Sequence, residues 1–146
     1  MGSRSRAGPT SDGGVHPAPS PLDVAALPPT GVCDLTTTGR RSGRPRTLEI
    51  WYVVHEGRLH VVGTPGPRHW LANLAADPNA RLRLHEPDLD LQVVASIVRH
   101  PTERARLTDT AWRVRPWYAA QGSTRADWVD GAPMVSLDAL SGAAVS

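Results

Sequence analysis

The stretch TTTGRRSGRPR, residues 36–46, joins the strand pattern of this chain to its densest group of arginines. Its three threonines are β-branched and favour extended backbone, so we predict a strand over residues 32–38. Residues 39–45 have the composition of a turn. A turn between two strands can gather backbone N–H groups and guanidinium groups around one point. The stretch therefore favours the binding of an anion such as a phosphate.

Two other interpretations of this turn are a solvated loop, in which water separates the charges, and a weak nucleic-acid patch. The arginines are confined to one turn instead of spreading along a face, and the formal net charge of the chain is only +2. Both observations disfavour a nucleic-acid surface, so we expect no nucleic-acid partner. The solvated loop stays open at this point.

The composition restricts the remaining function classes. The 146 residues suffice for one domain with its own core. Cys33 is the single cysteine, which excludes an internal disulfide framework and a cysteine-rich metal site. The histidines after residue 21 are scattered without metal-ligand spacing, so we expect no metal. No apolar run could span a membrane, and the N-terminus lacks an apolar signal core. We therefore expect a soluble, cytoplasmic protein.

Outward from the arginine turn, the pattern predicts mostly antiparallel strands. We expect strands over residues 47–55, 58–63, 80–85, 89–99 and 132–137, and helices over residues 68–76 and from Pro101 onward. The first two of these strands form a hairpin around Glu56-Gly57. Because no regular crossover helices separate the strands, we predict a mainly β fold, a small barrel with inserted helices. We further expect a disordered tail over residues 1–21, a short arm or single helical turn over 22–30, and one domain over 31–146.

Several side chains are candidates for a site. Glu49 shares a strand face with Trp51, so it either lines a pocket or lies on the surface of an edge strand. His69 stands out among the histidines because it adjoins a Gly/Pro-rich turn and Trp70. Large aromatic residues near the C-terminus either roof a ligand pocket or pack in the core. No pattern indicates a nucleophile or an acid–base pair, so we predict no catalytic side chain from the residues alone.

Residues 35–84 resemble the deazaflavin-dependent nitroreductase and quinone reductase family, whose small split-barrel proteins use coenzyme F-420. The matching stretches are LTTTGRRSG at 35–43, RPR at 44–46, VVG at 61–63, WLANL at 70–74 and DP at 77–78. The resemblance implies a split β-barrel of the flavin-binding type. It also implies hydride transfer from C5 of the reduced deazaflavin to a quinone, an enone or a nitro compound.

The same resemblance implies roles for individual residues. The cofactor's phosphate-bearing tail would lie on the arginine turn, and the deazaflavin ring would lie along the following strand. The cofactor-binding residues would be Thr38, Gly39, Arg40, Arg41, Ser42, Gly43, Arg46, Glu49, Ile50, Trp51, Gly63, Thr64 and Trp70. The substrate pocket would contain His69, Trp117, Tyr118 and Trp128, with the Tyr118 hydroxyl as the candidate catalytic group near the substrate.

Two alternatives remain open beside this expectation. The barrel could bind FMN, as related split-barrel oxidoreductases do, or it could be a non-catalytic module that binds another ligand. In each case the partner is a small molecule. A barrel with exposed edge strands also favours a homodimer.

Overall fold

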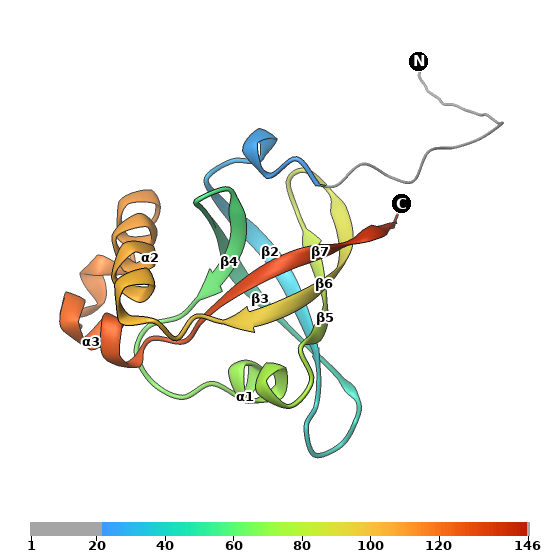
Figure 1. Cartoon of the computed structure of the whole chain (residues 1–146), viewed down its shortest axis with the longest axis horizontal. Helices are drawn as coiled ribbons and strands as arrows, with labels where there is room; N and C mark the ends of the chain where they lie inside the picture. Colours follow the sequence, from blue (N-terminus) through green and yellow to red (C-terminus); the bar gives the residue numbers. More distant parts are fainter. Residues whose placement is uncertain (1–21, 146) are drawn as a thin grey trace, which may run out of the picture.

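The computed structural model describes the backbone of residues 22–145 and the side chains of residues 22–140. Six antiparallel strands close into a barrel in the order β2-β3-β4-β7-β6-β5 (Figure 1). The strands are β2 (Thr30–Thr38), β3 (Pro45–His55), β4 (Arg58–Val62), β5 (Asn79–Leu84), β6 (Leu89–Ile97) and β7 (Met134–Val145). The predicted mainly β barrel is confirmed. The tail predicted for residues 1–21 lies outside the described residues.

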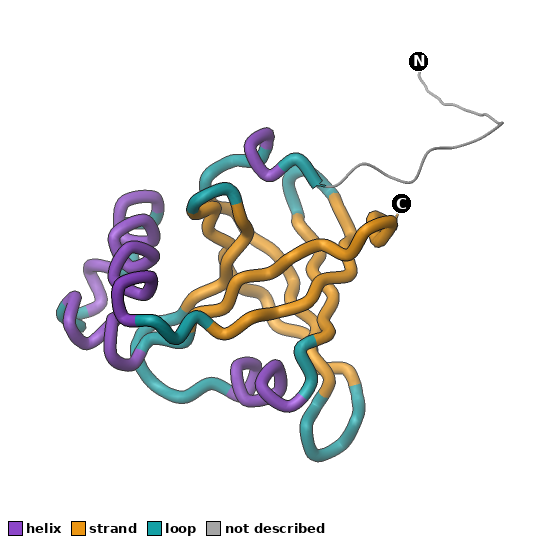
Figure 2. The backbone as a smooth tube through the Cα atoms, viewed as in Figure 1, coloured by secondary structure: helices purple, strands orange, loops and turns teal. Residues whose placement is uncertain are grey.

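Three helices accompany the barrel, and Figure 2 shows two of them together on one side of it. They are α1 (His69–Ala76), α2 (Pro101–Val114) and α3 (Arg125–Gly131). Two short 3-10 turns, η1 (Val24–Ala26) and η2 (Ala119–Gln121), complete the described elements. The turn η1 lies within residues 22–30, the segment expected to form a short arm or a single helical turn. None of the helices in the described residues is long and apolar enough to cross a membrane.

Near the C-terminal end of β3, at Tyr52 and Val53, both faces of the barrel wall are buried. Tyr52 points inward and packs with Leu35, Leu82 and the other buried residues of the barrel core. Its neighbour Val53 points outward and is covered by the helix pair α2 and α3. Both side chains are fully buried. Successive side chains of the strand therefore pack into two separate cores, one inside the barrel and one between the barrel and the helix pair.

The helix α1 lies at the end of the barrel near the loop that joins β2 to β3 (Figure 1). Trp70 and Leu74, four residues apart, share one helix face and join the barrel core. The helix ends at Asp77, whose N–H bonds to the Asn73 carbonyl. Pro78 follows and cannot continue the helix. This placement brings α1 against the arginine turn, through His69 and Asn73.

Two elements differ from the sequence prediction. β7 runs to Val145, whereas the predicted strand ends at residue 137. The extra length pairs with β6 across a register shift between Leu91 and Val93, a non-local contact that the sequence of β7 does not reveal. Helix α3 was not predicted, although Thr124 and Asp127 form a reciprocal capping box at its start.

Candidate cofactor-binding site

The arginine turn between β2 and β3 is a closed loop held by its own hydrogen bonds. Gly39 N donates to the Arg44 carbonyl at 2.8 Å, and Gly43 N donates to the Gly39 carbonyl at 2.8 Å. Arg44 N donates to Ser42 Oγ at 3.1 Å. A Cβ at Gly39 would lie 2.6 Å from Ser42 Oγ and 3.1 Å from the Arg44 carbonyl oxygen, so a larger residue would displace the Ser42 hydroxyl and crowd the loop. The loop is therefore ordered by its own backbone.

These hydrogen bonds leave little of the backbone anion nest that the sequence suggested. Gly39, Gly43 and Arg44 use their N–H groups within the loop, and Arg40 N donates to Asn73 Oδ1. Within the described residues, only the N–H groups of Arg41 and Ser42 lack an acceptor in this loop. Anion binding here must therefore depend mainly on the guanidinium groups.

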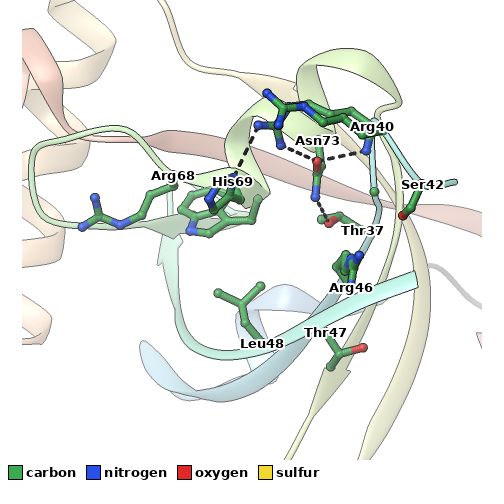
Figure 3. A pocket seen from close by; sticks show the side chains of 12 residues that line it. Thr37, Arg40, Ser42, Arg46, Thr47, Leu48, Arg68, His69 and Asn73 are labelled. Atoms are coloured by element: carbon green, nitrogen blue, oxygen red, sulfur yellow. Dashed lines mark hydrogen bonds between the residues drawn. The ribbon is translucent and has the colours of Figure 1, made fainter. Parts of the chain in front are cut away.

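Arg40 is held from two sides over α1 (Figure 3). Its Nη1 donates to Asn73 Oδ1 at 2.9 Å, and its Nη2 lies 3.4 Å from His69 Nδ1. Because a guanidinium only donates, His69 Nδ1 accepts in this arrangement. Asn73 Nδ2 in turn donates to Thr37 Oγ1 at 3.1 Å. The contacts join β2, the arginine turn and α1 in one network.

The positive charge at this end of the barrel is not balanced by carboxylates. Elsewhere, five arginines lie within ion-pair distance of an aspartate or glutamate. Among the described residues, none of the arginines at positions 40, 41, 44, 46 and 68 has such a partner. Uncompensated guanidinium groups beside a cavity attract an anionic ligand.

A cavity of about 540 Å³ opens between the turn, β3 and α1. It is lined by Thr37, Gly39, Arg40, Arg41, Ser42, Arg46, Thr47, Leu48, Arg68, His69, Trp70 and Asn73. We call it the arginine cavity. Seven of the residues expected at the site are brought together here. Thr38 and Gly43 are not among them, because they line a separate hollow of about 290 Å³ beside β5 and β6.

A second cavity, of about 400 Å³, continues along β3. Its lining contains Leu48, Glu49, Ile50, Trp51, Val62, Gly63, Thr64, Arg68, Trp70, Trp117 and Tyr118. We call it the aromatic cavity. Leu48, Arg68 and Trp70 line both cavities, so the two are adjacent. Glu49 is among the residues that line this cavity, and its side chain is also exposed to solvent.

The aromatic cavity is bounded by three rings in edge-to-face contact. Trp51 lies 5.4 Å from Trp117 and 5.5 Å from Tyr118, measured between ring centroids. Arg115 places its Cζ 4.0 Å from the centre of the Trp51 ring, a cation–π contact. Trp117 is 50% exposed. An exposed aromatic at a cavity rim is available for contact with a ligand.

Trp128 does not line either cavity. It is fully buried between the helix pair and the barrel, with its ring 5.1 Å from that of Tyr118. Its contribution to the site is support for Tyr118 from behind. The sequence could not separate these roles, since both kinds of position favour a large aromatic residue.

Tyr118 is the titratable group best placed in the aromatic cavity. Burial raises the pKa of its phenol to about 12, which the nearby Arg115 partly opposes. The phenol therefore stays protonated at neutral pH and can donate a hydrogen bond. Its hydroxyl makes no hydrogen bond to another described residue, so it is free to bond to a ligand.

Burial also raises the pKa of the Cys33 thiol to about 12 inside the barrel, which makes it unreactive.

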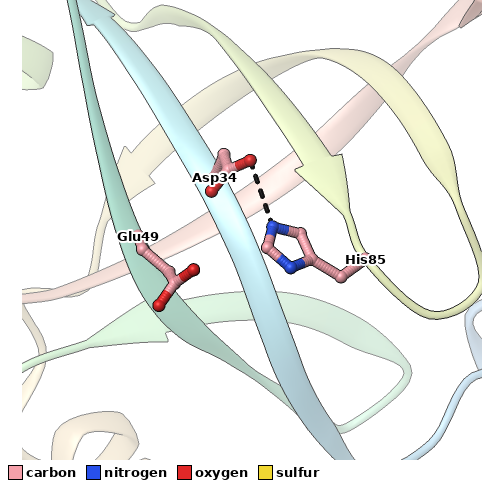
Figure 4. A group of neighbouring side chains, drawn as sticks. All are labelled: Asp34, Glu49 and His85. Atoms are coloured by element: carbon pink, nitrogen blue, oxygen red, sulfur yellow. Dashed lines mark ion pairs between the residues drawn. The ribbon is translucent and has the colours of Figure 1, made fainter.

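Asp34, Glu49 and His85 meet on the outer wall of the barrel (Figure 4). Each residue offers one side-chain atom that could bind a metal ion, and these atoms all lie within 4.8 Å of one another. Asp34 and Glu49 are close because they are paired across β2 and β3. His85 Nε2 lies 3.1 Å from Asp34 Oδ2, an ion pair when the imidazole is protonated. All three side chains are at least partly exposed. The scattered histidine spacing did not reveal this group.

Six lining residues were absent from the sequence-based set: Thr37, Thr47, Leu48, Val62, Arg68 and Asn73. The sequence could have indicated Asn73, because its spacing places it on the same helix face as Trp70 and Leu74, which is the buried face of α1. A buried amide needs hydrogen-bond partners and so indicates a built contact. Nothing in the sequence pattern around Arg68 indicated that it lines the site. Its Nη2 bonds to the Thr64 carbonyl at 3.0 Å and to Thr64 Oγ1 at 2.8 Å, which holds it along the Gly63-to-Pro67 turn.

Comparison with known proteins assigns this chain to a family. A family model described as F420H2-dependent quinone reductase matches residues 24–133. A conserved hypothetical protein from Mycobacterium tuberculosis has a similar structure, with a TM-score of 0.59 and 19% identity over 75% of this chain and 72% of that chain. A structure described as an F420-H2 dependent reductase matches with a TM-score of 0.50 and 22% identity, over 73% of this chain and 93% of that chain.

A third structure, described as a domain-swapped dimer, has a TM-score of 0.52 and 22% identity, over 73% of this chain and 79% of that chain. These structural likenesses show the split-barrel fold. The family model covers well over half of the chain and agrees with the resemblance found in residues 35–84. The protein therefore belongs to the F420H2-dependent quinone reductase family and is a reductase with coenzyme F-420 as its cofactor.

Proposed function

We propose that this protein transfers a hydride from reduced F-420 to an electron-poor small organic acceptor such as a quinone, an enone or a nitro compound. The observation that carries the proposal is the adjacency of the arginine cavity and the aromatic cavity through Leu48, Arg68 and Trp70. A cofactor with an anionic tail and a planar ring requires these two surfaces side by side.

The donor set of the arginine cavity fits a phosphate. Arg41 and Arg46 are exposed, line the cavity and have no carboxylate partner among the described residues. Each can form bidentate, charge-assisted hydrogen bonds to phosphate oxygens. Ser42 Oγ accepts from Arg44 N, which leaves its own proton free for a phosphate oxygen. Arg40, Arg41, Ser42 and Arg46 are therefore the proposed tail-binding residues.

The aromatic cavity fits a planar ring and a planar acceptor. Ile50, Trp51 and Trp70 would contact the ring, and Gly63 and Thr64 would lie along its edge. When bound, F-420 supplies the hydride donor, so the chain mainly orients the reactants and excludes water. Tyr118 would donate a hydrogen bond to an oxygen of the acceptor, because its phenol stays protonated and its hydroxyl has no partner among the described residues. Trp117 would contact the acceptor from the rim of the aromatic cavity, whereas His69, expected in the substrate pocket, lines the arginine cavity and would lie nearer the cofactor's tail.

The exposed carboxylate of Glu49 also lines this cavity. A negative charge there would disfavour an anionic acceptor, so we propose that the substrate is uncharged.

We also propose a homodimer, because the neighbour described as a domain-swapped dimer shares the fold. Light scattering of the purified protein would give a monomer mass if that assembly is wrong.

The direct test is the oxidation of reduced F-420 by the purified protein with one acceptor from each of the three classes. The proposal predicts that at least one class accelerates the oxidation well above the rate without protein. Reduced FMN, tested in parallel, should give no such acceleration. If reduced FMN is oxidised and reduced F-420 is not, the FMN-binding alternative replaces the proposal. If neither is oxidised, a non-catalytic binding protein is the better description.

A further inference from the structure

Arg40 enters the arginine cavity already fixed in position. Its backbone N–H and its Nη1 both donate to Asn73 Oδ1, at 3.1 and 2.9 Å. Asn73 is only 4% exposed, although it carries two polar groups on an otherwise apolar helix face. Its Nδ2 donates to Thr37 Oγ1 at 3.1 Å, and Thr37 is itself 2% exposed. The amide is therefore oriented from both of its ends (Figure 3).

We propose that Asn73 is a positioning residue that orients Arg40 toward the anionic part of the cofactor while leaving the charge of Arg40 uncancelled. This inference rests on the proposed function, since it assigns the anion to the arginine cavity. Five other arginines in the described chain lie within ion-pair distance of a carboxylate. A carboxylate at position 73 would hold Arg40 equally well, but it would neutralise the charge that an anion needs.

A neutral amide acceptor resolves this conflict. Asn73 Oδ1 receives two N–H donors and contributes no net charge, so the full positive charge of Arg40 faces the cavity. Arg40 would otherwise lose the entropy of a long, mobile side chain when the ligand binds. Holding the guanidinium in advance removes part of that cost. The neutrality of the acceptor, and not only its position, is therefore the property under test.

The test compares Asn73→Ala with Asn73→Asp, and uses two probes, inorganic pyrophosphate and oxidised F-420, in calorimetric titrations of the full chain. Asn73→Ala should weaken the binding of both probes about tenfold, because the ligand must then order the Arg40 side chain itself. Asn73→Asp should also weaken both about tenfold. The two variants should differ in hydrogen exchange of the Arg40 amide, which stays protected in Asn73→Asp and becomes fast in Asn73→Ala.

A double-mutant cycle separates positioning from direct contact. In an Arg40→Ala background, Asn73→Ala should cause no further loss of affinity. In an Arg41→Ala background, it should cause the same tenfold loss as in the wild type. Thr37→Val, which removes the acceptor for Asn73 Nδ2, should weaken binding by less, and Thr37→Ser should restore it. These Thr37 variants keep the test decisive if Asn73→Ala does not fold.

Additive losses in the Arg40→Ala background would overturn the inference, as would wild-type affinity in Asn73→Asp. A wild-type protein that binds pyrophosphate but not F-420 would contradict the proposed function while leaving the role of Asn73 to be judged on pyrophosphate. A wild-type protein that binds neither probe would overturn both.

Discussion

Replacing Arg41 by alanine should weaken F-420 binding without changing the fold. Arg41 is exposed, lines the arginine cavity and has no carboxylate partner among the described residues. A charge-assisted hydrogen bond contributes about 1.5–3 kcal/mol. Solvent reduces this at an exposed site, so we expect a loss of about 1.4 kcal/mol, or about tenfold in Kd. The unfolding free energy should change by less than about 0.5 kcal/mol, as for other surface substitutions.

Arg44 is the matched control for this variant. It is an exposed arginine of the same loop, but it does not line the arginine cavity. Arg44→Ala should therefore change the Kd for F-420 by less than about twofold. The assay is a fluorescence titration of each variant at two salt concentrations, with urea denaturation to check the fold. The difference between the two variants should shrink at high salt because exposed charges are screened.

The reasoning would be refuted if Arg41→Ala and Arg44→Ala had the same effect on Kd, because the affinity would then report the general charge of the loop. It would also be refuted if Arg41→Ala bound F-420 as tightly as the wild type at low salt.

Three further predictions concern other parts of the structure. Arg104 donates to the carbonyls of Val98, Trp128, Val129 and Ala132. Arg104→Ala should lower the unfolding free energy by about 2–4 kcal/mol in urea denaturation, and a loss below about 1 kcal/mol would show that water replaces these bonds. Burial lowers the pKa of His60 from 6.5 to about 4. The unfolded chain thus binds this proton more readily, so stability should be full above about pH 6.5 and fall by up to about 3 kcal/mol as the pH drops to 4. His60→Asn should flatten that slope in urea denaturation, and an unchanged slope would assign it to other groups. Tyr118→Phe should lower kcat about 10- to 100-fold and leave the Kd for F-420 unchanged. An unchanged kcat would exclude a role for the Tyr118 hydroxyl at the acceptor.

The fold was predictable where local pattern and packing agree. The alternation of Leu82 and Leu84 with Arg81 and Arg83 gave β5 correctly, because one face of that strand enters the barrel core. The strand order was not predictable in detail. Closure depends on the pairing of β2 with β5 and of β4 with β7, and no local pattern encodes such distant partners.

The candidate site was predictable in part for the same reason. The arginine turn is contiguous in sequence, so its residues could be assigned together. Asn73 lies 33 residues from Arg40, and their contact exists only after α1 has packed against the end of the barrel. Trp117 and Trp128 have the same chemistry in the sequence, but one is half exposed at a cavity and the other is fully buried. Burial of this kind depends on the tertiary arrangement of α2, α3 and the barrel.

The central claim is that the arginine cavity and the aromatic cavity together hold F-420. Titration of the purified wild-type protein with F-420 and with FMN, each followed by its own absorption and fluorescence, tests it most directly. The account predicts saturable binding of F-420 that weakens with salt, and no saturable binding of FMN in the same concentration range. Saturable binding of FMN without binding of F-420 would contradict it.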